Sequence, residues 1–189
     1  MATSIIQQGD SVLHTIAKDI PISNISTPKI RKYINLMHKA LAEEHDGVAL
    51  AAPQIGIPLR IFVIAPNIVS KKKNISSAPV SMEKQKKKEN LVYINPRVIK
   101  HSRKKVWVEE GCLSVRWYYG ETERYERLTV EAYDEHGKKF TRGAGGLLAQ
   151  IIQHEIDHLN GTLFIDHGRK IRKLSEKEIA KYKKELYET

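Results

Sequence analysis

The segment Gln153-His154-Glu155-Ile156-Asp157-His158-Leu159-Asn160-Gly161 is the part of the sequence from which the rest can be interpreted. Its two histidines are four residues apart, which on an α-helix, at roughly 100° per residue, separates them by about 40°, so both imidazoles share one face. Each can offer a nitrogen to one metal ion, and Glu155 is a candidate general base. Solvated surface helices also carry such patterns, so the interpretation depends on a third ligand, a cleft and hydrogen-bond donors elsewhere.

The composition is that of an ordinary globular protein. Of the 189 residues, 41% are hydrophobic and 29% are charged, and no apolar run approaches the length of a membrane helix. Residues 1–20 lack the basic and apolar regions of a secretory signal. The single cysteine, Cys112, excludes an intrachain disulfide and fits a reducing compartment. We therefore expect one domain over residues 1–189, with no membrane association, in the cytoplasm.

The net charge of +10 raises the question of nucleic-acid binding. Lysines gather in residues 71–88, and a second basic cluster in residues 169–184 is interleaved with glutamates. The first cluster has no alternating aromatic residues on which bases could stack. We expect solvated surfaces and no sequence-specific nucleic-acid binding, while contact with an RNA-rich particle stays open.

Apolar periodicity predicts the elements in the first half of the chain. A short helix follows Asp10, and a longer one begins at Pro28 and ends near Asp46-Gly47. The longer helix places four apolar residues on one stripe: Ile30, Ile34, Met37 and Leu41. Residues 59–65 form a continuous apolar run, typical of a buried strand. The polar, lysine-rich residues 66–90 then predict a long loop inserted within the domain.

Strand signals resume after this loop. The expected elements are strands at 91–94 and 104–108 around a turn at Asn95-Pro96, and a hairpin over 128–141. Ser175 and Glu178 form a capping box that opens a basic C-terminal helix at about 175–187. Strands followed by a core helix indicate an α+β fold with a mainly antiparallel sheet.

A catalytic metal site needs a third protein ligand besides the two histidines. The position six residues beyond the second histidine, where one class of zinc peptidases has another histidine, is Phe164. A downstream glutamate, Glu176 or Glu178, could serve as in thermolysin-like enzymes. Cys112 is the stronger candidate, because a thiolate binds zinc or ferrous iron well, although a lone cysteine is often only a small buried side chain.

Gln54 stands out in the first half of the chain because residues 47–56 are otherwise small or apolar. Burying an amide is costly unless it is hydrogen-bonded. Such an amide satisfies local backbone groups or donates to a ligand, and the sequence alone leaves both open.

Three segments, Gly47–Gly56, Glu110–Ser114 and Gln153–His158, together resemble the signature motifs of peptide deformylases. They occur in that family's order and at compatible spacing, and the likeness extends over most of residues 5–170. The resemblance implies an α+β fold in which mainly antiparallel sheets pack around a central helix carrying the His-Glu-x-x-His motif. It also implies a metal-dependent hydrolase that removes the formyl group from the N-terminal formylmethionine of nascent polypeptides.

The resemblance further implies a role for each motif residue. Cys112, His154 and His158 would bind the metal, natively Fe²⁺ in this family and often replaced by Zn²⁺, Ni²⁺ or Co²⁺. Glu155 would take a proton from the attacking water and later give it to the leaving amine, while charge on the carbonyl oxygen would be stabilised by two donors. The two donors would be the Gln54 side-chain amide and the Leu113 N–H. The residues expected to bind the peptide are Gly47, Val48, Ala49 and Gly111.

The chain departs from the family pattern around the cleft. Ala49 stands where the family usually has glycine, and Arg116 where it usually has proline, followed by the aromatic run 117–119. These changes alter the cleft rim without removing a ligand or the base. The basic helix at about 175–187 resembles the extension that docks bacterial deformylases onto the ribosome; a merely solvated helix is the other interpretation.

Two alternatives belong to other functional classes. One is a zinc-dependent peptidase in which a glutamate is the third ligand. The other is a non-catalytic basic protein that binds RNA or the ribosome and whose metal is structural. Cys112→Ser separates the first alternative from a deformylase, because only the deformylase needs that thiolate.

Overall fold

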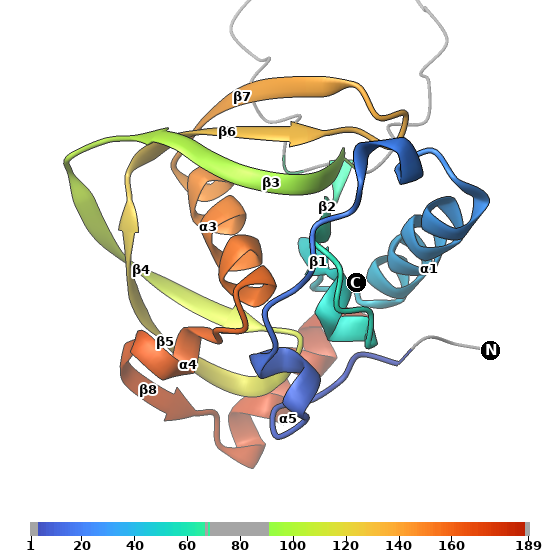
Figure 1. Cartoon of the computed structure of the whole chain (residues 1–189). Coiled ribbons are helices and arrows are strands. Elements are labelled where there is room, and N and C mark those ends of the chain that lie inside the picture. Colours follow the sequence, from blue (N-terminus) through green and yellow to red (C-terminus); the bar gives the residue numbers. More distant parts are fainter. Residues whose placement is uncertain (1–3, 67, 69–90, 188–189) are drawn as a thin grey trace, which may run out of the picture.

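The computed structural model describes residues 4–66, 68 and 91–187. Two antiparallel sheets pack around a central helix, α3 (Leu147–Leu159), which carries the His-Glu-x-x-His segment (Figure 1). The α+β fold expected from the sequence, with mainly antiparallel sheets around this helix, is confirmed. Within the described ranges no helix combines the length and apolar character needed to cross a membrane.

The larger sheet has five strands in the order β1-β2-β3-β6-β7, each antiparallel to its neighbour. Their bounds are β1 Ala49–Ala51, β2 Ile61–Ile64, β3 Leu91–His101, β6 Arg127–Tyr133 and β7 Lys139–Gly145. Every residue of β2 is buried, which explains the continuous apolar run in its sequence. β6 alternates buried with more exposed residues, and it forms the expected hairpin with β7.

The first two strands of this sheet separate two cores. Phe62 and Ile64 pack with apolar residues of α3, whereas Leu50 and Val63 pack with α1 (Pro28–Glu43). The apolar stripe expected on α1 is buried: Ile30, Ile34, Met37 and Leu41. α1 ends three residues earlier than predicted, so that residues 44–46 leave the helix and lead toward β1.

The predicted turn at Asn95-Pro96 is wrong, because β3 continues through it. The strand register shifts between Ile94 and Arg97, and Asn95 adopts φ 49°, so the two residues form a bulge. A bulge accommodates the missing N–H of a proline, and asparagine tolerates the left-handed region. The Asn95 side chain also accepts from the Ile20 N–H at 2.9 Å and donates to the Ile20 carbonyl at 2.7 Å.

The smaller sheet has three strands in the order β4-β5-β8. They are β4 Lys105–Cys112, β5 Val115–Tyr125 and β8 Arg169–Lys173. A tight turn joins β4 to β5 directly after Cys112, and the N-terminal segment holds it, because the Gln8 N–H donates to the Ser114 carbonyl at 2.7 Å. The other elements are η1 Ser11–His14, η2 Ile22–Asn24, η3 Ala52–Ile55, α4 Phe164–His167 and α5 Glu176–Tyr187.

The helices expected near the two ends of the chain are both present. The short helix after Asp10 is the 3₁₀ turn η1, whose Val12 N–H donates to the Asp10 carboxylate at 3.0 Å. At α5, the Ser175 N–H donates to the Glu178 carboxylate at 2.7 Å, as the capping box requires. The loop expected at 66–90 falls almost entirely outside the described residues.

Candidate metal centre

Three side chains from two distant parts of the sequence meet at the centre of the molecule. Cys112 ends β4, while His154 and His158 lie one turn apart on α3. Their ligand atoms all lie within 4.8 Å of one another, and the Cys112 Sγ is 3.1 Å from the His158 Nε2. Neither Glu176 nor Glu178 belongs to this group, and the Glu178 carboxylate is used by the capping box of α5.

The donor set fits a tetrahedral metal ion with one open position. One sulfur and two nitrogen ligands suit zinc or ferrous iron. His154 Nδ1 is 3.0 Å from Glu110 Oε2, which leaves its other ring nitrogen for the centre. Two further atoms, Glu155 Oε2 and His158 Nδ1, are buried and have no hydrogen-bond partner among the described residues. The residues present therefore fit a bound metal.

The electrostatics of the cluster favour a thiolate. Burial raises the pKa of the Cys112 thiol, but the positive charges and hydrogen bonds of His158 and His154 outweigh burial and lower that pKa to about 5. A thiolate at neutral pH is the form that binds metals.

A buried ion-pair network orients His154. Arg124 donates through Nε and Nη2 to the two Glu110 oxygens, both at 2.8 Å, and through Nη1 to Asp157 at 2.6 Å. Burial opposes ionisation of Glu110, but the hydrogen bonds from Arg124 and His154 lower its pKa to about 2. Glu110 thus stays charged and fixes the imidazole, as partners of metal-binding histidines commonly do.

The sequence did not indicate Arg124. Only the structure shows that Arg124 is at a buried position of β5, between the more exposed Glu123 and Tyr125. Asp157 pairs with Arg124 and with His167 Nε2, the latter at 3.3 Å. Gln153 bonds the Tyr125 backbone and so ties α3 to β5.

Glu155 is a buried carboxyl beside the two histidines. It is 3% exposed, and burial raises the pKa of its carboxyl to about 7, although the charges of His154 and His158 oppose the rise. A carboxyl that titrates near neutral pH can both accept and return a proton.

Gln54 points its amide nitrogen toward the same centre. It lies on η3, where its Oε1 accepts from the Ala51 N–H at 2.8 Å. Its Nε2 donates to Ser114 Oγ at 3.1 Å and lies 3.5 Å from Cys112 Sγ. Fixing the oxygen on the backbone orients the nitrogen, so the expectation that this buried amide satisfies local backbone is confirmed, while its donation to a ligand stays a prediction. Leu113, the other expected donor, directly follows Cys112 in the turn.

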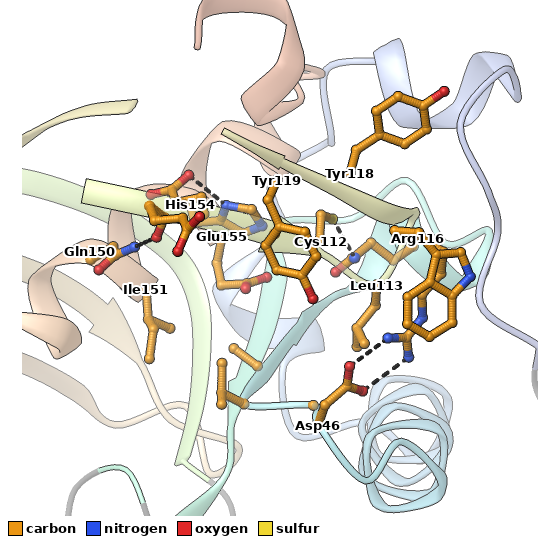
Figure 2. Close-up of a pocket in the computed structure, with 18 of the residues that line it drawn as sticks. Asp46, Cys112, Leu113, Arg116, Tyr118, Tyr119, Gln150, Ile151, His154 and Glu155 are labelled. Carbon is orange, nitrogen blue, oxygen red and sulfur yellow. Dashed lines mark hydrogen bonds and ion pairs between the residues drawn. The ribbon is translucent and has the colours of Figure 1, made fainter. Parts of the chain in front are cut away.

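A cleft of about 240 Å³ opens beside the cluster (Figure 2). One edge is formed by residues 46–49 and the other by residues 109–113, with His154 and Glu155 between them. The four residues expected to contact a peptide all line it: Gly47, Val48, Ala49 and Gly111. Gly47 is needed for the close turn after α1, because a Cβ there would lie 2.8 Å from Leu41 Cδ1.

Other residues at the cleft were not singled out from the sequence. α3 contributes Leu147, Gln150 and Ile151, and α5 contributes Tyr182. Gln150 and Ile151 could have been found from helical spacing, since they stand one turn before His154 and Glu155. Tyr182 is 24 residues beyond His158, and no local pattern connects it to the cleft.

Comparison with known proteins identifies the family. The family model described as polypeptide deformylase matches residues 2–174. The chain belongs to the polypeptide deformylase family. Peptide deformylase of Rhizobium meliloti (strain 1021) is 39% identical over 164 residues, which cover 84% of this chain and 85% of the relative. Deformylases depend on a metal ion, in agreement with the Cys112, His154 and His158 cluster.

Plant and structural relatives extend the comparison. Peptide deformylase 1A, chloroplastic/mitochondrial, of Arabidopsis thaliana is 39% identical over 165 residues, or 86% of this chain, and the chain spans 60% of that relative's length. A peptide deformylase structure from Legionella pneumophila is 33% identical, with TM-score 0.72, and covers 100% of this chain and 95% of that one. A class I type b deformylase from Acinetobacter baumannii has TM-score 0.73 at 28% identity, covering 88% and 99%.

Proposed function

We propose that the chain is a peptide deformylase, with residues 1–189 forming one catalytic domain. It hydrolyses the formamide of N-terminal formylmethionine in nascent polypeptides and releases formate. The observation that carries this proposal is that the general base Glu155, the donors Cys112 and His154, and the Gln54 amide all face one cleft. A formyl group small enough to enter the centre therefore meets a base and a hydrogen-bond donor together.

The proposed ligands are Cys112, His154 and His158, and the proposed native ion is Fe²⁺, with Zn²⁺, Ni²⁺ or Co²⁺ able to replace it. When bound, the ion supplies a Lewis acid and a nucleophile at neutral pH. The mixed sulfur and nitrogen donors support this choice over magnesium or calcium, which prefer oxygen ligands.

The protein groups divide the remaining tasks. Glu155 accepts the proton of the attacking water and returns it to the leaving amine, which is a poor leaving group unless protonated. The Gln54 Nε2 and the Leu113 N–H donate to the carbonyl oxygen as negative charge develops on it, and each such donor is typically worth about 2.7–4 kcal/mol. Gln54 needs little reorganisation for this, because its amide is already held by Ala51 and Ser114.

The peptide lies in the cleft between residues 47–49 and residues 109–111. Both edges belong to strands or to their immediate extensions, so an extended peptide can add to them through backbone hydrogen bonds. Nascent formylated chains in the cytoplasm are the proposed substrates. The basic helix α5 is the proposed contact with the ribosome.

Formate release from formyl-Met-Ala-Ser, by protein purified without oxygen, tests the activity. Wild-type protein should release formate with about one metal ion per chain, and Cys112→Ser should lose both metal and activity. Glu135→Ala, a change on the distant β6–β7 turn, serves as the control and should match wild type. Unchanged metal content and turnover in Cys112→Ser would refute the ligand set and favour a peptidase with a glutamate ligand.

A further inference from the structure

The C-terminal helix α5 reaches the cleft through Tyr182. This side chain lines the cleft, and its hydroxyl donates to Asp46 Oδ2 at 3.3 Å. Its ring packs edge-on against Trp117, with ring centroids 6.0 Å apart and planes at 79°. Tyr182 is half-buried, whereas the adjacent Lys181 side chain is 79% exposed. Among residues 176–185 of α5 only Ile179 and Tyr182 are partly buried, and Tyr182 is the one that lines the cleft.

An ion-pair cluster, Arg116 with Glu44 and Asp46, holds the rim on which Tyr182 rests. The guanidinium of Arg116 donates to both Asp46 oxygens, at 2.6 and 3.1 Å, and also to Glu44. Arg116 lies on β5, and the two carboxylates lie between α1 and β1, so the cluster ties β5 to the cleft edge formed by residues 46–49. Figure 2 shows Arg116 on the other side of Leu113 from Glu155, and its contacts with Asp46 as dashed lines.

Tyr119 lines the cleft beside Tyr182. Its ring lies against Gly111, where an added Cβ would come within 2.8 Å of the Tyr119 Cε1. Burial, the neighbouring Tyr119 phenol and the Asp46 carboxylate together raise the pKa of Tyr182, which therefore stays a neutral hydrogen-bond donor. Tyr119, from β5, and Tyr182, from α5, thus both line the cleft and together form an aromatic wall.

We propose that Tyr182 is a specificity-determining residue that binds the part of the peptide beyond the formylated residue. The proposal rests on the deformylase function. An extended chain advances about 3.3 Å per residue, so a formylated tripeptide spans about 10 Å and leads outward from the centre along the wall. A single formylated residue ends before Tyr182. Aromatic rings bind apolar and aromatic side chains best, so the wall favours such residues after the first position.

Steady-state kinetics with two substrates test the assignment. For Tyr182→Ala we expect KM for formyl-Met-Leu-Phe to rise about tenfold, the equivalent of one lost aromatic contact, with kcat within about twofold. KM and kcat for formyl-Met-amide should stay at wild-type values. Tyr182→Phe keeps the ring and should retain most of the affinity for the tripeptide, and Lys181→Ala, at the neighbouring exposed position, should behave as wild type.

The outcomes separate this assignment from the function on which it rests. Equal KM changes for both substrates would indicate a general structural effect and would overturn it, as would wild-type kinetics in Tyr182→Ala. If wild-type protein releases no formate from either substrate, the deformylase function is wrong. The affinity for unformylated Met-Leu-Phe, measured by calorimetry, then still tests the peptide-binding role of Tyr182. Weaker binding by Tyr182→Ala than by wild type supports this role, and equal binding refutes it.

Discussion

Replacing Gln54 by alanine tests the proposed stabilisation of the carbonyl oxygen. The Gln54 amide makes two hydrogen bonds, from the Ala51 N–H and to the Ser114 hydroxyl, and turns its Nε2 toward Cys112. The side chain is 2% exposed, so water cannot readily take its place. Gln54→Ala therefore removes a preorganised donor and leaves two buried groups with one partner fewer.

The size of the effect follows from these two losses. One donor to a developing oxyanion is worth about 2.7–4 kcal/mol, so kcat should fall about 10²–10³-fold. Each buried group deprived of its partner costs about 1–3 kcal/mol, so the free energy of unfolding should also fall, by about 2–6 kcal/mol. Ser114→Ala removes one hydrogen bond but keeps the donor, so it should cost stability while kcat falls far less.

The assay is formate release from formyl-Met-Ala-Ser at saturating substrate, with metal content and unfolding measured on the same samples. Metal content should not change, because Gln54 is not a proposed ligand. Wild-type kcat in folded, metal-loaded Gln54→Ala would refute the role of the amide. A Ser114→Ala variant as slow as Gln54→Ala would show that the loss comes from packing.

Three further predictions concern stability. Arg124→Met leaves the Glu110 carboxylate buried without its main partner. The free energy of unfolding, measured with urea, should therefore be about 3–5 kcal/mol lower than that of the wild type. Folding lowers the pKa of Glu110 to about 2, so the ionised carboxylate stabilises the fold above the ordinary glutamate pKa, and this stabilisation is lost as the pH falls toward 2. The melting temperature of the wild type should therefore decrease as the pH is lowered from about 5, and it should decrease less in Glu110→Gln. Asn95→Ala loses two hydrogen bonds and a residue suited to positive φ, so thermal unfolding should show about 2–4 kcal/mol lost, whereas a neutral result would contradict the bulge.

The sequence predicted the architecture where local patterns agree with tertiary packing. The stripe on α1 and the alternation in β6 gave the correct elements because each has one buried face. It failed at Asn95-Pro96, where local turn residues instead form a bulge fixed by hydrogen bonds to Ile20, 75 residues away in the chain. Long-range partners of this kind leave no local pattern.

The candidate site divides in the same way. Motif residues such as Gln54, Cys112 and His154 were expected from the resemblance, and the fold brings them to one cleft. Arg124 and Tyr182 were missed, because an arginine on a strand and a tyrosine on a terminal helix gain meaning only from what lies opposite them in space. Their roles could not have been derived from spacing along the chain.

Formate release by wild-type protein and by Glu155→Ala, both with measured metal content, tests the central claim most directly. The proposed mechanism predicts that both bind about one metal ion per chain, since Glu155 is not a ligand, and that Glu155→Ala loses deformylation of formyl-Met-Ala-Ser by several orders of magnitude. Undiminished turnover in Glu155→Ala, or no formate from metal-loaded wild-type protein, would contradict it.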